Sequence, residues 1–373
     1  MNYPLPSSNK ISVDKLCQLF DNTTNSYKYL WFLAILTKVR FNQRRVFSFD
    51  ELILEMMKFA WYPLNYFKLS FGAADKVLDS IKAGLNAINI SGNIGSEEIE
   101  KALLENHEVP AIKSLISNLS RYVPYRLLTP WFASQLRGIP DQRKNDLIVK
   151  YANDYFEDVY NSPVYKINAN NRIEISERWC NYLNEHHEIL KSFCLWNFVK
   201  YLEKLNPNVP SITEKLFEPK ARDLKQAREY WGIVIENSPS RSLRCIYTDN
   251  PVTRATLSLD HYIPWSFVTH DLIWNISPTL AYINSSKNDS LPDHNRYIDK
   301  FVDIQHHAFT SVLKVSPRLK ALEDFSILFN DSNKNILNSG PEAFKRRLKG
   351  TILSLNEIAS NIGFSTGWFY RLQ

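Results

Sequence analysis

Apolar positions in the first half of the chain follow the spacing of α-helices. The segment 27–39 is apolar on nearly every side, which predicts a helix buried in a core. Ser48 and Glu51 have the spacing of a capping box, so a helix is expected to begin there. Pro63 cannot continue that helix, and we expect it to end there. Further helices are predicted over 73–88, from 96 onwards, and over 110–119, 177–183 and 189–205.

Shorter stretches depart from the helical spacing. Residues 164–167 and 172–175 flank an asparagine-rich turn, which predicts a small β-hairpin. The segment 122–131 is aromatic and interrupted by proline, so it suits either the lining of a groove or a loop packed on the core. After residue 292 the spacing is helical again, and a basic helix is expected to begin near Phe344.

One stretch in the second half has a different pattern. The segments 242–247 and 256–261 are expected to form a hairpin that delivers an Asp-His pair into a loop. Apolar spacing behind a proline predicts a short helix over 279–287. Asn284 on this helix is then expected to point back towards Asp260 of the pair.

Several polar residues and a proline stand at fixed intervals in this stretch: Asp260, His261, Pro264, Asn275 and Asn284. The set resembles the motif of the HNH endonucleases, also called ββα-metal nucleases, which has an Asp-His-x-x-Pro sequence, a middle Asn and a final His or Asn. The spacing is nearest to that of the HNH domain of CRISPR effector nucleases. The resemblance covers about residues 241–292. A lone Asp-His pair is more often a turn or a surface pair, whereas four specified residues at fixed intervals are far more specific.

The resemblance implies a role for each motif residue. Asp260 and Asn284 become the metal ligands, and His261 becomes the general base that takes a proton from the attacking water. Asn275 becomes the residue that braces the loop and holds His261 in its tautomer and orientation. Lys287 becomes a phosphate contact.

These residue types suit the hydrolysis of a phosphodiester. The reaction needs an activated water and neutralisation of charge at phosphorus. A positioned base such as an imidazole raises the rate of such a reaction by roughly 10²–10⁴-fold. A carboxylate and an amide oxygen favour Mg²⁺ or Mn²⁺ over Zn²⁺. His270 and Asp271 also lie in the loop; they could be a second pair behind the site or alternative ligands, but solvated loop residues are favoured.

Composition narrows the class of protein. The 373 residues are 44% hydrophobic and 23% charged, which is ordinary for a folded globular protein, and the many aromatics with only ten glycines suit packed helices. The apolar run 29–36 is far shorter than the roughly 20 residues of a membrane span, so a cytoplasmic protein is expected. The four cysteines form no C-x-x-C pair, so we expect no disulfide framework and no zinc knuckle before the Asp-His pair.

A modest excess of positive charge permits a polyanion partner. The formal net charge is +6. Arg222, Lys225 and Arg228 recur every three residues, which predicts one basic face on a helix leading to the motif. Arg241, Arg244 and Arg254 would extend this basic approach. Phosphate contact and a solvated face are about equally favoured for these residues.

Together these features predict a mainly α protein with an inserted ββα-metal (HNH) module. We expect a helical domain over 1–236, which can divide near 155–170, the nuclease module over 237–295 and a C-terminal helical segment over 296–373.

The function expected from this reading is a Mg²⁺- or Mn²⁺-dependent endonuclease that nicks DNA. The chain as a whole resembles stand-alone HNH nucleases of bacterial restriction and anti-phage systems, which implies a defence role and partner proteins of such a system. Two alternatives stay open. One is a catalytically silent protein that binds nucleic acid or assembles a complex on an HNH scaffold, and the other is a nuclease that acts on RNA.

Overall fold

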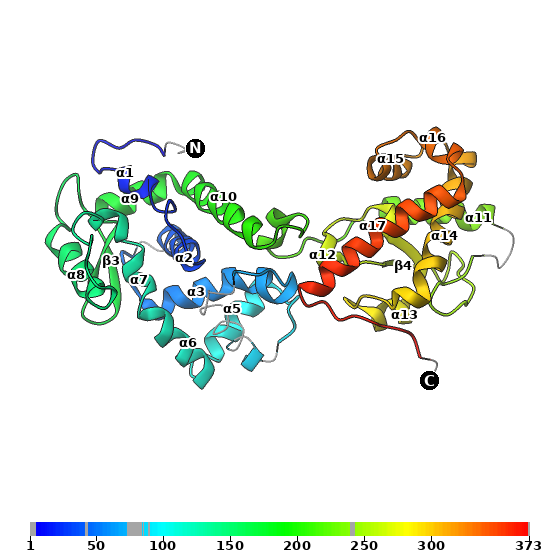
Figure 1. The fold of residues 1–373 in the computed structure, drawn as a ribbon. Helices are drawn as coiled ribbons and strands as arrows, with labels where there is room; N and C mark the ends of the chain where they lie inside the picture. Colours follow the sequence, from blue (N-terminus) through cyan, green and yellow to red (C-terminus); the bar gives the residue numbers. More distant parts are fainter. Residues whose placement is uncertain are drawn as a thin grey trace. The chain divides into compact units, whose positions relative to one another are not determined.

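The computed structural model describes residues 5–41, 44–72, 84, 86–88, 90–238 and 243–371. The chain divides into two compact units (Figure 1). Unit 1 comprises Met1–Pro207 and Lys215–Glu218, and unit 2 comprises Asn208–Glu214 and Pro219–Gln373. Both are mainly helical with short strands, which confirms the predicted class. Among the described residues, no helix combines the length and apolar character needed to cross a membrane.

Unit 1 is a helical body packed around α2, a helix whose residues are apolar on nearly every side. Its first half contains α1 (Asp14–Cys17), α2 (Tyr27–Phe41), β1 (Val46–Ser48), α3 (Phe49–Trp61), η1 (Tyr62–Tyr66), α5 (Ser96–Glu105) and α6 (Pro110–Ser120). Its second half contains α7 (Val123–Arg126), η2 (Thr129–Phe132), α8 (Asp141–Asp154), β2 (Tyr165–Asn168), β3 (Arg172–Ile175), α9 (Glu177–Glu185) and α10 (His187–Leu205). The short helix η3 (Ile212–Leu216) lies where the chain passes between the units.

Several predictions for unit 1 are confirmed. The helix α2 is buried and packs against α3, α9 and α10, as its apolar sides require. The capping box forms: Glu51 N donates to Ser48 Oγ at 3.2 Å, and Ser48 N donates to Glu51 Oε2 at 2.8 Å. The predicted hairpin is β2 and β3, and β1 adds to it in the order β1-β3-β2. Most of the helix expected over 73–88 lies outside the described residues.

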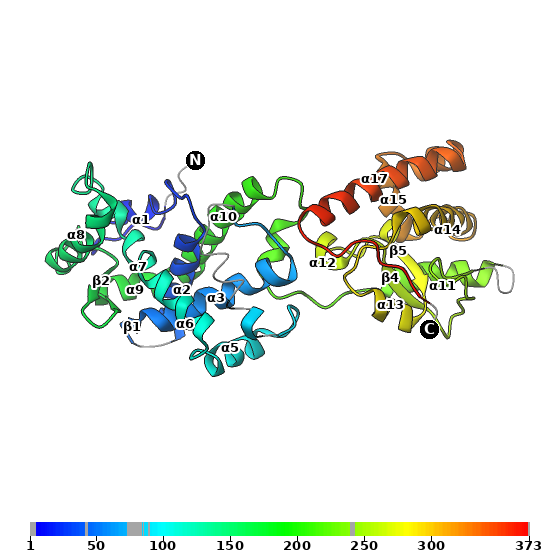
Figure 2. The same cartoon turned by 60° about the horizontal axis from the view of Figure 1, so that its bottom comes forward.

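In unit 2, helices surround a two-stranded sheet (Figure 2). Its first elements are α11 (Lys225–Asn237), β4 (Ser258–His261), α12 (Trp265–Val268), η4 (Ile273–Asn275), β5 (Ile276–Thr279) and α13 (Ala281–Lys287). They are followed by α14 (His294–Val315), η5 (Lys320–Leu322), α15 (Glu323–Phe329), α16 (Asn333–Asn338) and α17 (Pro341–Asn361).

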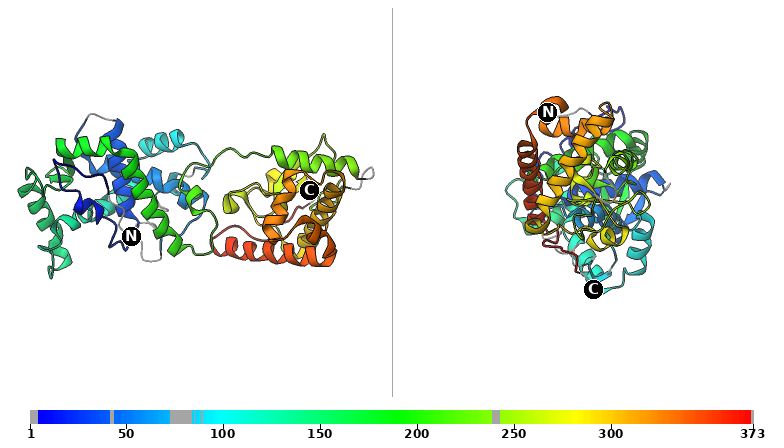
Figure 3. Two further views of the ribbon diagram at one scale, coloured as in Figure 1. Left: turned by 90° about the horizontal axis from the view of Figure 1, so that it is seen from above. Right: turned by 90° about the vertical axis from the view of Figure 1, so that its right-hand side faces the viewer.

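The helix α14 holds this sheet in place. It packs against β5, α11 and α17, and α17 runs alongside it (Figure 3). Gln305 on α14 is fully buried, and its Nε2 donates to the carbonyl oxygens of Ile273 at 3.1 Å and Ile276 at 2.7 Å. These bonds satisfy the backbone where η4 passes into β5, so the start of that strand is tied to the helix.

The predicted hairpin of 242–247 with 256–261 is wrong. The strand β4 pairs antiparallel with β5, and Asp260 lies opposite Ser277. Pro278 stands opposite Leu259 in this ladder. In a two-stranded ladder, alternate backbone N–H groups need no cross-strand partner, so a proline can be accommodated in this strand.

The predicted three-part division of the chain stays a prediction. In the structure, α11, the β4–α13 segment and the helices α14 to α17 all belong to unit 2. The segment around the Asp-His pair is therefore packed inside a larger compact body.

Candidate functional site

A pocket of about 200 Å³ opens in unit 2 where β4 ends beside α13. Its walls come from the end of β4, the start of α12, the last turn of α13 and the segment before α11. The lining residues are Arg222, Asp260, His261, Pro264, Trp265, Asn284, Ser285, Asn288 and Asp289. The predicted residues Asp260, His261, Asn284 and Arg222 thus share one small, polar cavity.

The turn after β4 is held by Asn275. The Asn275 side chain is fully buried, its Oδ1 accepts from Ile263 N at 2.9 Å, and its Nδ2 donates to Ile263 O at 2.9 Å. Its backbone oxygen also accepts from Tyr262 N at 2.8 Å. The side-chain amide therefore clamps Ile263 at both its polar ends, the backbone oxygen holds Tyr262, and Pro264 is the N-cap of α12.

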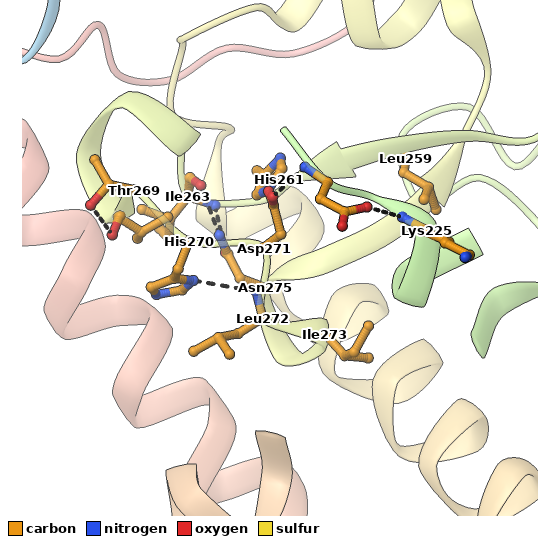
Figure 4. Close-up of polar contacts among 12 residues, drawn as sticks. Lys225, Leu259, His261, Ile263, Thr269, His270, Asp271, Leu272, Ile273 and Asn275 are labelled. Carbon is orange, nitrogen blue, oxygen red and sulfur yellow. Dashed lines mark hydrogen bonds and ion pairs between the residues drawn. The ribbon is translucent and has the colours of Figure 1, made fainter. Parts of the chain in front are cut away.

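The imidazole of His261 is held by a carboxylate. His261 and Asp271 lie side by side (Figure 4), with His261 Nε2 and Asp271 Oδ1 2.8 Å apart. The second carboxylate oxygen of Asp271 accepts from Asp223 N at 3.2 Å. Because an ionised carboxylate can only accept, Nε2 is the donor in this pair, and Nδ1 is the ring nitrogen that is left to act on another group. The side chain of His261 is 3% exposed and that of Asp271 is 21% exposed, so solvent screens this contact little.

The preference for solvated loop residues is wrong for Asp271. Its neighbour His270 turns elsewhere: His270 Nδ1 lies 3.4 Å from Leu272 N, and the ring packs 5.2 Å from that of Trp274. The orienting contact to the imidazole comes from Asp271, and Asn275 acts on the backbone beside it.

The carboxylate of Asp260 is buried between two donors. Lys287 Nζ donates to Asp260 Oδ1 at 3.0 Å, and the hydroxyl of Tyr247 donates to Oδ2 at 2.6 Å. Burial, together with the adjacent Asp260 charge, raises the pKa of Tyr247 well above its usual value, so the phenol stays a protonated donor. The two donors fix the orientation of the carboxylate, and each of its oxygens has lone pairs beyond the one used.

The structure places Lys287 differently from the expected phosphate contact. Its side chain is 0% exposed, and its ammonium bonds to Asp260 and to the carbonyl oxygen of His261 at 2.7 Å. It lies one helical turn after Ile283, on the buried face of α13. In this arrangement the ammonium neutralises a carboxylate inside the unit.

Asn284 is anchored through its amide nitrogen. Nδ2 donates to Leu259 O at 2.9 Å and to Ser258 Oγ at 3.1 Å, both on β4. The carbonyl end of the amide is therefore the acceptor that Asn284 offers to the pocket, which it lines together with Asp260. A carboxylate and an amide oxygen fit a hard divalent cation with few protein ligands. In the described part of the chain, no group of three or more His, Cys, Asp or Glu side chains is placed to hold a metal ion.

Arg222 lies at the pocket, but not on a helix. The helix α11 begins at Lys225, so the predicted basic face shared by Arg222, Lys225 and Arg228 is wrong at its first member. The guanidinium carbon of Arg222 lies 5.7 Å from the centre of the Trp265 ring, and both residues line the cavity. Lys225 and Arg228 are exposed on α11 and are not among the lining residues.

The remaining basic residues of the predicted approach bond elsewhere. Arg254 Nη2 pairs with Glu236 Oε1 on α11 at 2.7 Å. Arg244 Nη1 donates to the carbonyl oxygen of Asp249 at 2.6 Å. Neither lines the pocket. Arg241 lies outside the described residues.

Comparison with known proteins identifies one family. Residues 245–293 match the HNH endonuclease family. No curated protein and no solved structure showed significant similarity to the chain. The match runs from the turn that contains Tyr247 through β4, β5 and α13 to the residue before α14, so the chain is a mainly α protein that contains an HNH module, as predicted. The closer resemblance to the HNH domain of CRISPR effector nucleases stays a prediction.

Proposed function

We propose that unit 2 is a metal-dependent endonuclease that hydrolyses DNA phosphodiester bonds. The observation that carries this proposal is the pairing of His261 with Asp271 at a pocket that His261 shares with Asp260 and Asn284. A base, its orienting group and two hard oxygen donors are the parts that hydrolytic cleavage of a phosphodiester needs.

His261 acts as the general base in this proposal. Its Nδ1 takes the proton from the attacking water, and the adjacent carboxylate of Asp271 stabilises the imidazolium that forms. Asn275 keeps the backbone after His261 from moving during this transfer, because both ends of its amide are bonded to Ile263. The imidazole therefore needs little reorganisation when the proton moves.

Asp260 and Asn284 are the residues that would hold a divalent cation, Mg²⁺ or Mn²⁺. When bound, such an ion neutralises charge on the phosphate and assists departure of the leaving oxygen. Tyr247 and Lys287 orient the Asp260 carboxylate, since each donates to one of its two oxygens. Asn284 is held by β4 with its amide nitrogen turned away from the cavity.

Arg222 contacts the phosphate in this proposal. Its guanidinium stacks on Trp265 at the pocket wall, so its orientation is partly fixed before substrate binds. Lys225 and Arg228 are exposed on the helix that follows and would add phosphate contacts along the backbone of the nucleic acid. Arg244 and Arg254 would contribute only after leaving their present partners.

The expected product of one chain is a nick. The module has one Asp-His-x-x-Pro motif, and its Asp260 and His261 line one pocket, so a single engagement cuts one strand. A linear product needs a second chain or a second visit to the same DNA. A role in bacterial anti-phage or restriction systems, with partner proteins of such a system, is carried only by the resemblance of the sequence.

The proposal is tested by incubating the purified protein with supercoiled plasmid, linear DNA and RNA in Mg²⁺, in Mn²⁺ and in EDTA. We expect open circles to form first with either metal and nothing to form in EDTA. His261→Ala should lower the rate by roughly 10²–10⁴-fold. His270→Ala is the matched control, because the His270 ring accepts from Leu272 N and packs on Trp274, whereas the Asp271 carboxylate bonds to His261; this variant should leave the rate nearly unchanged.

Other outcomes would change the proposal. Cleavage of RNA alone would move the substrate class to RNA. Binding of DNA with no cleavage in either metal would favour the silent scaffold. Linear DNA from the outset at the lowest protein concentration would contradict the monomeric nickase.

A further inference from the structure

The last described residues fold back onto the HNH module. The helix α17 ends at Asn361, and Phe364 N bonds to Ala359 O at 3.1 Å while Gly363 takes a φ of +96°. A positive φ is easily reached only by glycine, so the chain stops its helix sharply here. We call residues 362–371 the C-terminal tail; it runs back along unit 2 (Figures 1 and 2, red).

The tail is bonded to the segment between α13 and α14. Leu291 N donates to Ser365 O at 2.8 Å, Trp368 N donates to Leu291 O at 3.0 Å, and Asp293 N donates to Trp368 O at 2.8 Å. Phe364 is buried against Phe267 of α12, with ring centres 5.9 Å apart. These backbone bonds give the tail one register on the module.

Trp368 of the tail packs against the phenol that bonds to Asp260. The rings of Trp368 and Tyr247 are 5.1 Å apart at 88°, and Tyr297 of α14 meets the same Tyr247 ring at 5.0 Å and 80°. These are edge-to-face contacts, which aromatic rings favour. Tyr247 lies in a turn outside any strand or helix, so its ring depends on such packing for its position.

We infer that the C-terminal tail is part of the nuclease site, and that Trp368 is a positioning residue that acts on Asp260 through Tyr247. This inference rests on the proposed role of Asp260 as a ligand of the divalent cation. Trp368 holds the ring, the ring aims the hydroxyl at Asp260 Oδ2 across 2.6 Å, and the hydroxyl sets the direction of the remaining lone pairs. Partners behind a metal ligand commonly matter by about 10–100-fold in metal affinity.

The test is Mn²⁺ binding to the full chain without nucleic acid, followed by calorimetry. We expect Tyr247→Phe and Trp368→Ala each to raise the Kd for Mn²⁺ by about tenfold or more, with Trp368→Phe closer to wild type because it keeps an aromatic edge. Tyr370→Ala is the matched control, since Tyr370 lies on the same tail but packs on Tyr282 at 5.9 Å. It should bind Mn²⁺ like wild type.

A double variant separates positioning from general loss of structure. If Trp368 acts through Tyr247, then Tyr247→Phe with Trp368→Ala should bind Mn²⁺ no more weakly than Tyr247→Phe alone. Losses in Mn²⁺ affinity that multiply in the double variant would overturn the inference, because they would mean independent structural damage. If Trp368→Ala does not fold, Tyr247→Phe still tests the hydroxyl contact to Asp260, and Trp368→Phe tests the tail contact through a smaller rise in the Kd for Mn²⁺, which should vanish in the Tyr247→Phe background.

Failure of the tail inference can be distinguished from failure of the proposed metal site. Wild-type affinity in Trp368→Ala, alongside tight Mn²⁺ binding by the wild type, would overturn the role of the tail and leave the nuclease proposal standing. Failure of the wild type to bind Mn²⁺ would overturn the metal site itself, and the inference with it. Plasmid cleavage by the same proteins then reports whether the change in metal affinity is carried into the rate.

Discussion

Replacing Lys287 with methionine should destabilise unit 2 strongly and leave nucleic-acid contacts nearly unchanged. The Lys287 ammonium is 0% exposed and the Asp260 side chain 3% exposed, so the pair lies out of water. Lys287→Met removes the charge but keeps a chain of similar length, and Asp260 is left with Tyr247 as its remaining donor. A carboxylate without its counter-charge in such a place is costly.

The expected magnitude follows from the burial of both partners. Breaking a buried ion pair from one side costs about 3–5 kcal/mol. The bond from Lys287 Nζ to His261 O at 2.7 Å is lost as well, which leaves a buried carbonyl short of a donor. Adding Asp260→Asn should recover a large part of the loss, because the double variant buries no unpaired charge.

Hydrogen exchange read by mass spectrometry on peptides that cover β4 and α13 measures this effect within unit 2. A loss of 3–5 kcal/mol raises the population of the globally open state, and with it the amide exchange rate of these segments, by roughly 10² to several times 10³. The salt slope of DNA binding should not change, because a buried ammonium releases no counterions. An unchanged exchange rate together with a reduced salt slope would refute this reasoning and return Lys287 to the role of a phosphate contact.

Three further perturbations test other parts of the structure. Asp271→Asn should lower the single-turnover cleavage rate about tenfold or more while Mn²⁺ affinity stays near wild type, because the amide no longer stabilises a charged His261; an equal rate in both proteins would contradict the pair. Arg222→Gln should lower the cleavage rate and reduce the salt slope of log K by about one, whereas Lys225→Gln, away from the pocket, should change only the slope; loss of rate in both alike would argue against a special place for Arg222. Burial lowers the pKa of Lys215 in unit 1 to about 7, whereas an unfolded lysine titrates near about 10.4, so between these pH values the unfolded chain holds one more proton and stability rises with pH, by up to about 1.4 kcal/mol per unit. Thermal unfolding should show this rise in the wild type relative to Lys215→Met, and parallel curves for the two proteins would show that Lys215 is charged when folded.

Features that depend on neighbouring residues could be predicted without the structure. The capping box of Ser48 and Glu51 is closed by bonds within four residues, and the apolar spacing of α2 reports its burial directly. The motif spacing likewise placed Asp260 and Asn284 on facing elements, because the strand end and the short helix that carry them lie close along the chain.

The sequence could not show which of two adjacent polar residues makes a given tertiary contact. His270 and Asp271 are adjacent and equally polar, yet only Asp271 meets the imidazole of His261. The sequence has no signal for this choice, because it depends on how the loop between α12 and η4 turns. The spacing behind Pro278 predicts a helix, yet Pro278 itself pairs in β5 opposite Leu259, which only the packing of the two strands decides.

Sequence alone therefore determined the helical class and the HNH motif, and it supplied the candidate residues for the proposed chemistry. Tertiary structure decided which of those residues face solvent. It buried Lys287 beside Asp260, and it brought Trp368 from the end of the chain onto Tyr247. The physical reason is that periodicity and capping arise from contacts a few residues apart, whereas burial and long-range packing depend on the path of the whole chain and on which surfaces its helices cover.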